Sequence, residues 1–100
     1  MLGDLRKKML EKEREIQQRI EALRISSESS DKTVSAVING RHQIVELHIE
    51  LEKIDSAELL EDLLLVCLNK GHQEINDKSA ALMRHDLHDL LPPGLDKIFG

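Results

Sequence analysis

The first quarter of the chain carries a narrow apolar stripe on an otherwise polar segment. The apolar positions, most of them seven residues apart, are Leu2, Leu5, Met9, Ile16, Ile20 and Leu23. At 3.6 residues per turn they cover a stripe only about 60° wide, which is typical of a coiled-coil seam. Residues 4–24 also lack glycine and proline and are rich in strong helix formers. The pattern predicts a helix over about residues 3–24 that exposes most of its circumference unless a partner covers it.

The middle of the chain changes to the two-residue period of β-strands. Residues 32–38 combine alternation with β-branched side chains, residues 41–49 alternate cleanly, and residues 24–29 add a weaker strand before them. Between the two stronger strands, Asn39-Gly40 supplies the pair with positive φ that a type I′ hairpin turn requires. Alternation divides the last strand into one face with Gln43, Val45, Leu47 and Ile49 and another with His42, Ile44, Glu46 and His48. We therefore expect an antiparallel hairpin, extended to three strands.

The second half of the chain predicts a long helix over about residues 56–84. Asp55 with Glu58 has the spacing of a capping box, with Asp in place of the usual Ser or Thr. The first part of this helix is apolar on two faces and must be buried on both, whereas the second part narrows to one stripe. Gly71 lies in that stripe and costs about 1 kcal/mol of helix propensity relative to Ala. It either lets another helix approach closely or is a tolerated local weakness.

Composition indicates one small domain, residues 1–100, with an almost wholly aliphatic core. Because so short a chain with long helices has little material for a core, we expect it to pair with a second copy. Cys67 is the only cysteine, so the sequence has no disulfide framework, and its apolar neighbours predict a buried thiol. The chain is charged from its fourth residue, which excludes a signal peptide. The longest apolar run, residues 63–68, is too short to span a membrane. We expect a cytoplasmic protein.

The C-terminal tail, residues 90–100 (LLPPGLDKIFG), differs from the rest of the chain. It holds both prolines and the only aromatic residue, Phe99. Pro92 and Pro93, followed by Gly94, should stop the preceding helix and turn the chain. We expect Phe99 to bury its ring against the body of the protein or against a dimer mate, so that Phe99→Ala would cost about 3 kcal/mol.

Charge is distributed unevenly along the chain. The formal net charge is −5, yet residues 1–24 hold seven basic against five acidic residues. On a helix, Lys8, Lys12 and Arg19 fall within about 40° of one another, beside the apolar seam. The other basic residues lie elsewhere on the helix, Arg6 and Arg24 on the opposite flank and Lys7 and Arg14 pointing away. The strip either binds a polyanion or is a solvated helix face, and without aromatic platforms any nucleic-acid contact would be to duplex backbone.

The sequence gives little support for catalysis or for bound groups. It has no nucleophile elbow, phosphate-binding loop or dinucleotide fingerprint, so we expect neither an enzyme nor a cofactor or small-molecule ligand. His85 and His88 are three residues apart, with Asp86 and Asp89 between and after them. Zinc sites need three or four ligands on rigid elements. Solvated histidines near a helix C-terminus explain the pattern better than a metal site does.

Several of these strings, taken in order, resemble one family. The first helix has Met9, Lys12, Ile16 and Ile20 at its apolar and basic positions, and the hairpin closes on Ile38-Asn39-Gly40. The second helix opens with ELLEDLLLVCLNKGHQEIN, and the chain ends in the Leu-Pro-Pro-Gly tail. Over its whole length the chain is similar to the YbaB/EbfC family of bacterial nucleoid-associated DNA-binding proteins. It departs from the family at residues 29–31, Ser-Ser-Asp, where members often have glycines.

The resemblance implies an α+β fold, in which an α-β-β-β-α protomer forms a tweezer-like homodimer. The strands would form the shared body and the helices the projecting prongs, with no cofactor, metal or catalytic residue. It also implies nucleoid-associated binding of duplex DNA with relaxed sequence specificity, and a role in nucleoid organisation or transcription. Lys8, Lys12 and Arg19 are then the first candidates for phosphate contact, and the second set is Arg6, Lys7, Arg14 and Arg24. Of these, Lys12 alone matches a basic family position. The alternative is a dimeric protein-interaction module that does not bind DNA.

Overall fold

The computed structural model describes the backbone of residues 2–88 and the side chains of residues 2–85. The elements are α1 (Leu2–Ala22), β1 (Arg24–Glu28), β2 (Val34–Asn39), β3 (Ile44–Ile49), the 3₁₀ turn η1 (Leu51–Lys53) and α2 (Ala57–His88). The predicted order of one helix, three strands and a long second helix is confirmed. None of the described helices is long and apolar enough to cross a membrane.

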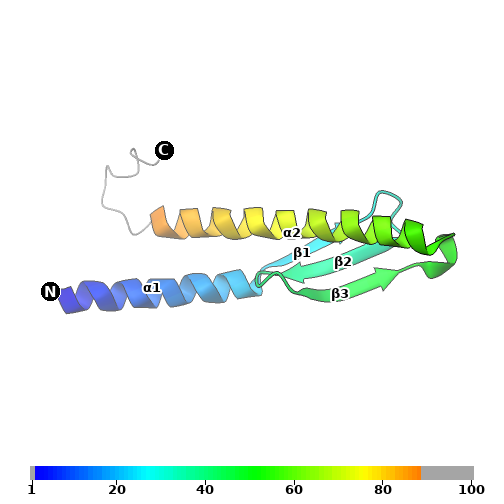
Figure 1. Ribbon diagram of the computed structural model, residues 1–100. Helices are drawn as coiled ribbons and strands as arrows, with labels where there is room; N and C mark the ends of the chain where they lie inside the picture. The colour runs from blue at the N-terminus through cyan, green and yellow to red at the C-terminus, as the bar shows by residue number, and fades with distance from the viewer. Residues whose placement is uncertain (1, 89–100) are drawn as a thin grey trace.

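The strands form an antiparallel sheet in the order β1-β2-β3, and α2 runs along one face of it. Figure 1 shows that α1 and the C-terminal part of α2 extend beyond the sheet in the same direction. The chain measures 65 × 25 × 15 Å, with a radius of gyration of 19.1 Å. A compact chain of this length would have a radius of about 13 Å. The protomer is therefore a thin body, formed by the sheet and the first part of α2, with two helical arms.

The core lies between α2 and the first two strands. Near the arms, Ile25 of β1 and Ile38 of β2 pack against Ile75 of α2. Toward the other end, a second buried cluster joins Val34, Ala36 and Cys67 and is bordered by Ile49, Ile54, Leu60, Leu63, Leu64 and Leu68. Cys67 is fully buried, as predicted. The core is thus built on one face of two strands, and β3 contributes only its last residue.

Gly71 marks the closest approach of α2 to the sheet. A Cβ atom at this position would lie 2.4 Å from Cδ1 of Ile38 and 3.1 Å from Cβ of Ser27. The neighbour that requires a small residue is therefore the sheet, and not a second helix. One turn earlier, the Ser27 hydroxyl donates a hydrogen bond of 2.8 Å to the carbonyl of Cys67. This bond satisfies a buried hydroxyl and fixes the position of α2 along the strand.

The turn between β2 and β3 differs from the predicted type I′ turn. Positive φ occurs at His42 (64°) and at neither Asn39 nor Gly40. The His42 amide donates to the Asn39 carbonyl at 3.0 Å, and the Asn39 amide to the Gln43 carbonyl at 3.0 Å. This is a three-residue connection in which a left-handed residue follows a type I turn. The prediction was wrong because it assumed that Gly40 is needed for a positive φ. Glycine is needed here because the backbone carbonyl of Ile20 leaves no room for a side chain.

A β-bulge also changes the predicted faces of β3. Leu47 is paired with Ala36 and Ile49 with Val34, but the register shifts at Val37, so that Ile44 is paired with Ile38. The prediction that Ile44 lies on the face opposite Leu47 was therefore wrong. One extra residue in a strand reverses the alternation beyond it. Since paired residues share a face, Ile44 and Leu47 both belong to the side of the sheet on which α2 packs.

One other local detail, the cap of α2, corrects the sequence predictions, and the β1–β2 loop has a notable conformation. The hydroxyl of Ser56 accepts a hydrogen bond of 3.1 Å from the Leu59 amide, so Ser56 caps α2 in place of Asp55. In the β1–β2 loop, Lys32 has a φ of 64°. Asp31 braces this loop by accepting hydrogen bonds from the hydroxyls of Thr33 (2.7 Å) and Ser29 (2.8 Å). The predicted tail, with Pro92, Pro93, Gly94 and Phe99, lies outside the described residues.

Candidate nucleic-acid interface

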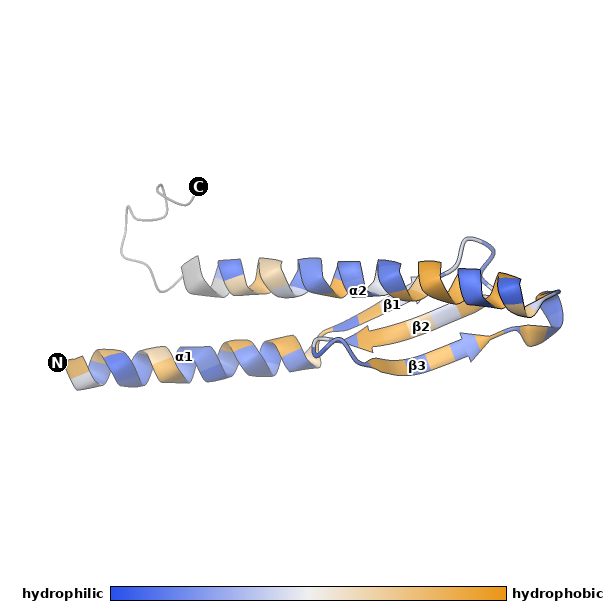
Figure 2. Ribbon diagram, viewed as in Figure 1, coloured by the Kyte–Doolittle hydropathy of each residue, from blue (hydrophilic) through white to orange (hydrophobic). Residues whose placement is uncertain are grey.

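The arm formed by α1 is exposed over most of its length. Its buried residues are Ile16 and Ile20, in its last two turns. The apolar residues of the first turns are exposed, with 85% of Leu2, 57% of Leu5 and 55% of Met9 accessible. Figure 2 shows that hydrophilic residues cover much of α1, whereas apolar residues gather on β2, β3 and the adjoining part of α2. The first 14 residues of α1 are thus available for contact with another molecule.

The structure places six of the seven basic candidates on this arm. Arg6, Lys7, Lys8, Arg14 and Arg19 are exposed, and Lys12 is half-buried. The ammonium of Lys12 lies 3.8 Å from the carboxylate of Glu15, one turn further along α1. Ion pairs at a protein surface contribute about 0–1 kcal/mol. Lys8, Lys12 and Arg19 lie on one helix, as predicted.

Arg24 has a different environment from the other candidates. It is the first residue of β1, and its guanidinium donates to the carbonyls of Glu21 (2.9 Å) and Leu23 (2.8 Å). These are carbonyls at the C-terminus of α1, which has no further helical N–H groups to bond them. Arg24 therefore caps α1, and a cation at this end also complements the helix dipole.

Sequence reasoning missed three exposed basic residues near the arms. Arg41, in the β2–β3 turn, forms an ion pair with Glu21 at the base of α1. Lys78 and Arg84 lie on the C-terminal part of α2, which extends beyond the sheet on the same side as α1 (Figure 1). The sequence places these three far from the basic first segment. Only the fold brings them to the same end of the molecule.

The opposite end of the body carries mainly acidic groups. Hydrogen bonds from the hydroxyls of Thr33 and Ser29 hold the pKa of the Asp31 carboxyl below its usual value. Nearby, the Lys53 ammonium lies 2.8 Å from the Glu50 carboxylate. This hydrogen-bonded pair lowers the pKa of Glu50 and raises that of Lys53. These carboxylates stay ionised at neutral pH, so a polyanion would be repelled from this end and directed to the arms.

A second surface of the protomer is apolar. Ile44, Val45 and Leu47 of β3 are 42%, 45% and 49% exposed, because α2 packs over β1 and β2 and leaves β3 uncovered. On α2, Leu65 and Val66 are each 60% exposed. A shallow depression of about 510 Å³ follows this flank of the helix, lined by Glu61, Leu64, Leu65, Leu68, Asn69 and His72. Ile49 of β3 and Leu64 and Leu68 of this flank all border the cluster around Val34.

Among the side chains of residues 2–85, no three of His, Cys, Asp or Glu gather closely enough to hold a metal ion. The basic arms, the uncovered apolar face and the helix–sheet–helix order together define a class of protein. This class consists of α+β binding proteins whose ligand-contacting side chains lie on exposed helices.

Comparison with known proteins identifies the family. The profile of the YbaB/EbfC DNA-binding family matches residues 1–89, so the chain belongs to that family, whose members are DNA-binding proteins and not enzymes. A nucleoid-associated protein of Chlorobaculum parvum is 30% identical, aligning 98% of this chain with 92% of that protein. A nucleoid-associated protein of Agrobacterium fabrum is 32% identical over 95% of this chain and 91% of its own.

A solved structure shares the fold. The crystal structure of the uncharacterized protein HP0035 from Helicobacter pylori superimposes with a TM-score of 0.76 at 23% sequence identity. The match covers 86% of this chain and 92% of the Helicobacter protein. The arrangement of arms and sheet is therefore not peculiar to this sequence.

Proposed function

We propose that this protein is a homodimeric, nucleoid-associated protein of the cytoplasm that binds duplex DNA through backbone contacts. The observation that carries the proposal is membership of the YbaB/EbfC DNA-binding family over residues 1–89. The nucleoid-associated relatives, aligned over nearly the whole chain, support the localisation. Binding with relaxed sequence specificity would contribute to nucleoid organisation or to transcription control.

In this proposal the phosphate contacts come from α1. Lys8, Lys12 and Arg19 are the first candidates because they fall on one strip along α1. The second set comprises Arg6, Lys7 and Arg14. Arg24 caps the helix and would reach a phosphate only beside its bonds to carbonyl oxygens.

The proposed dimer uses the uncovered apolar surface of β3 and α2. In the single chain, three neighbouring side chains of β3 on this surface are nearly half exposed. Contiguous exposed apolar patches are rare in monomers and mark interaction sites. Pairing two copies there would place the strands in a shared body and leave the four helical arms projecting. Light scattering should give twice the mass of the chain at micromolar concentration, and a monomer mass would contradict the dimer.

The alternative is a dimeric protein-interaction module that does not bind DNA. Its support is the net charge of −7 carried by residues 25–100, which would repel DNA from most of the surface. In that case the basic residues of α1 would only be solvated. The two functions differ in what happens when duplex DNA is added.

Fluorescence anisotropy with generic duplex DNA at 50 and 200 mM salt separates the two. Wild type should bind, and if it neutralises about five phosphates, the slope of log K against log salt should be about −4.5. The triple Lys8/Lys12/Arg19→Ala variant should bind more weakly and with a shallower slope. The matched control, Lys32/Lys53/Lys70→Ala, removes three positive charges from the body and should bind nearly as wild type.

No binding by wild type at the lower salt concentration would exclude DNA as the ligand and favour the protein-interaction module. Equal loss in both triple variants would mean that total charge, and not the strip on α1, determines affinity.

A further inference from the structure

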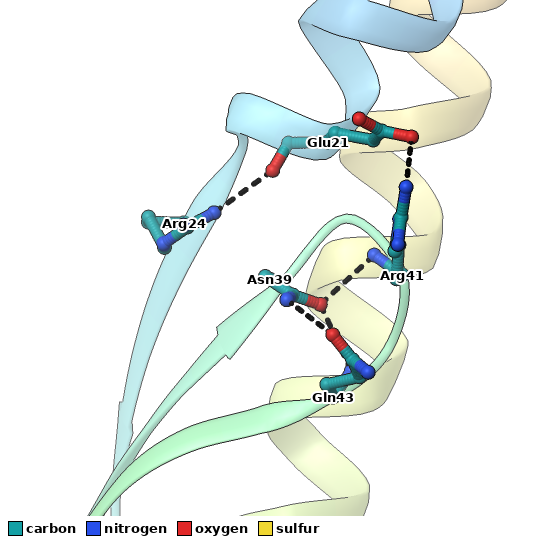
Figure 3. Close-up of polar contacts among 5 residues, drawn as sticks. All are labelled: Glu21, Arg24, Asn39, Arg41 and Gln43. Atoms are coloured by element: carbon teal, nitrogen blue, oxygen red, sulfur yellow. Dashed lines mark hydrogen bonds and ion pairs between the residues drawn. The ribbon is translucent and has the colours of Figure 1, made fainter.

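The β2–β3 turn is held by its own side chains in a fixed conformation. The side-chain oxygen of Asn39 accepts hydrogen bonds from the backbone amides of Arg41 (2.9 Å) and Gln43 (3.0 Å). The amide group of Asn39 donates to the side-chain oxygen of Gln43 at 2.9 Å. Figure 3 shows these bonds at the tip of the hairpin, beside the last turn of α1. The turn is therefore a preformed block and not a loose connection.

This block contacts the end of α1 in two places. A Cβ atom on Gly40 would lie 1.6 Å from the carbonyl oxygen of Ile20 and 2.5 Å from its carbonyl carbon. The Gly40 backbone thus lies directly against the backbone of α1, and only hydrogen fits between them. Beside this contact, Arg41 reaches from the turn to pair with the carboxylate of Glu21, as Figure 3 shows.

The same block also contacts α2. The rings of His42 and His72 stack with their centroids 6.2 Å apart and an interplanar angle of 20°. Nε2 of His72 lies 3.1 Å from the carbonyl oxygen of His42. Residues 40–42 are therefore placed between the base of α1 and the side of α2, and each contacts one helix.

Apart from this turn, α1 is held by direct contacts with α2 and by the burial of its last two turns. Of its residues, Ile16 and Ile20 are the buried ones, and the 14 residues before Ile16 are exposed or, at Lys12, half-buried. These 14 residues form a lever about 20 Å long. A rotation of about 10° at the base would therefore move the tip by about 3–4 Å. Small changes at the turn are amplified at the basic strip.

We propose that Gly40 and Arg41 are positioning residues, which hold α1 at the angle to α2 that its basic strip needs to bind DNA. Gly40 sets how closely the turn approaches the Ile20 carbonyl, and Arg41 holds the other side through Glu21. The effect on DNA rests on the proposed function, whereas the effect on the angle between the arms does not. Neither residue has to touch DNA.

The geometric part is tested by distance measurements without DNA. Nitroxide labels are attached at Glu11→Cys in α1 and Asn76→Cys in α2, where both positions are exposed. An excess of unlabelled protein keeps labels on one protomer of any dimer, and Cys67 is buried away from the reagent. Glu11 lies about 13 Å along α1 from Ile20, so a rotation of about 10° in Gly40→Ala should shift the label-to-label distance by about 2 Å. The control, Gly3→Ala, adds the same methyl group where nothing lies within 4 Å and should leave the distance unchanged.

The effect on DNA binding is tested with two substitutions, each of which removes one negative charge from α1. Glu21→Gln removes a negative charge and with it the ion pair to Arg41, whereas Glu13→Gln removes the same charge from an exposed position on the same helix. By electrostatics alone, both variants should bind duplex DNA more tightly than wild type. If the ion pair positions α1, Glu13→Gln should bind duplex DNA more tightly than wild type. Glu21→Gln should bind it more weakly, by a factor of about three or greater. The double variant Glu21→Arg/Arg41→Glu, which restores an opposite-charge pair, should recover binding.

An unchanged distance in Gly40→Ala, or tighter binding by Glu21→Gln, would overturn the proposal. If Gly40→Ala does not fold, the labelled Glu21→Gln variant provides the distance measurement instead. If wild type itself does not bind DNA, the proposed function fails, and the distances alone then decide whether the turn sets the angle of α1.

Discussion

The two hairpins of the sheet share β2 but differ in what covers them. In the β1–β2 hairpin, Ile25 and Ile38 are buried beneath α2. In the β2–β3 hairpin, the cross-strand partner of Ile38 is Ile44, which is 42% exposed. Ile38 and Ile44 are the same residue type, paired across one ladder, on one face of one sheet. What separates them is the path of a helix that begins more than ten residues later.

The turns of the two hairpins show the same contrast. Each contains a residue other than glycine with a φ of 64°, Lys32 in one and His42 in the other. Lys32 lies in a loop braced by Asp31 and its neighbours, whereas His42 lies in a turn that contacts both helices. The loop of the covered hairpin, at the acidic end of the body, therefore forms side-chain hydrogen bonds among its own residues. The uncovered hairpin contacts other elements through both its turn and its exposed strand.

The largest expected effect tests the difference in burial. Ile38→Ala should lower the free energy of unfolding by about 3 kcal/mol, because it leaves a cavity in a fully buried site. Ile44→Ala should cost less than about 1 kcal/mol in the monomer, because water already reaches that side chain. Urea unfolding of the two variants measures both. Equal costs at a concentration where the protein is monomeric would show that β3 is covered after all.

A smaller effect is expected where the uncovered hairpin meets a second copy. Leu47→Glu places a charge in the middle of the proposed dimer surface, where burial without a partner is costly. The dimer dissociation constant should rise at least about tenfold, which corresponds to about 1.4 kcal/mol. Sedimentation or light scattering over a dilution series measures the shift. The control Glu28→Gln, on the far face of β1, should leave association unchanged.

The smallest effect concerns the loop that closes the covered hairpin. The pKa of Asp31 is lowered, so its contribution to stability is present above the ordinary value of 3.8 and is lost as the pH falls through the lowered value. Asp31→Asn should therefore melt below wild type at neutral pH, and the difference should shrink in acid. Thermal unfolding at pH 7 and near pH 2.5 checks this. A difference that stays constant with pH would contradict the role given to the carboxylate, and Asp62→Asn is the charge control.

Periodicity predicted most of the fold. The seven-residue repeat gave α1, alternation gave the strands, and the β-branched run at residues 32–38 gave β2, the strand that is buried most completely. The details that were missed are nonlocal or depend on a single residue. One extra residue at the bulge reversed the face of Ile44, and one hydroxyl moved the helix cap from Asp55 to Ser56. Neither detail changes the average pattern on which such predictions depend.

The candidate site was predicted in part. The uneven charge along the sequence found the basic residues of α1, because residues close in sequence on one helix are also close in space. It missed Arg41, which reaches the base of α1 only because the hairpin folds back on it. It also treated Gly40 as a conformational requirement, whereas the structure assigns it a contact with the Ile20 carbonyl.

The sequence by itself determined which segments form helices and strands, where positive charge gathers, and which side chains are available for a core. These are properties of neighbours along the chain, fixed by backbone sterics and by the period of the apolar residues. Tertiary structure alone decided which apolar residues are covered, because burial depends on where α2 crosses the sheet. It also decided that α1 projects from the sheet, held at one end by a turn that the sequence places 20 residues away from Ile20.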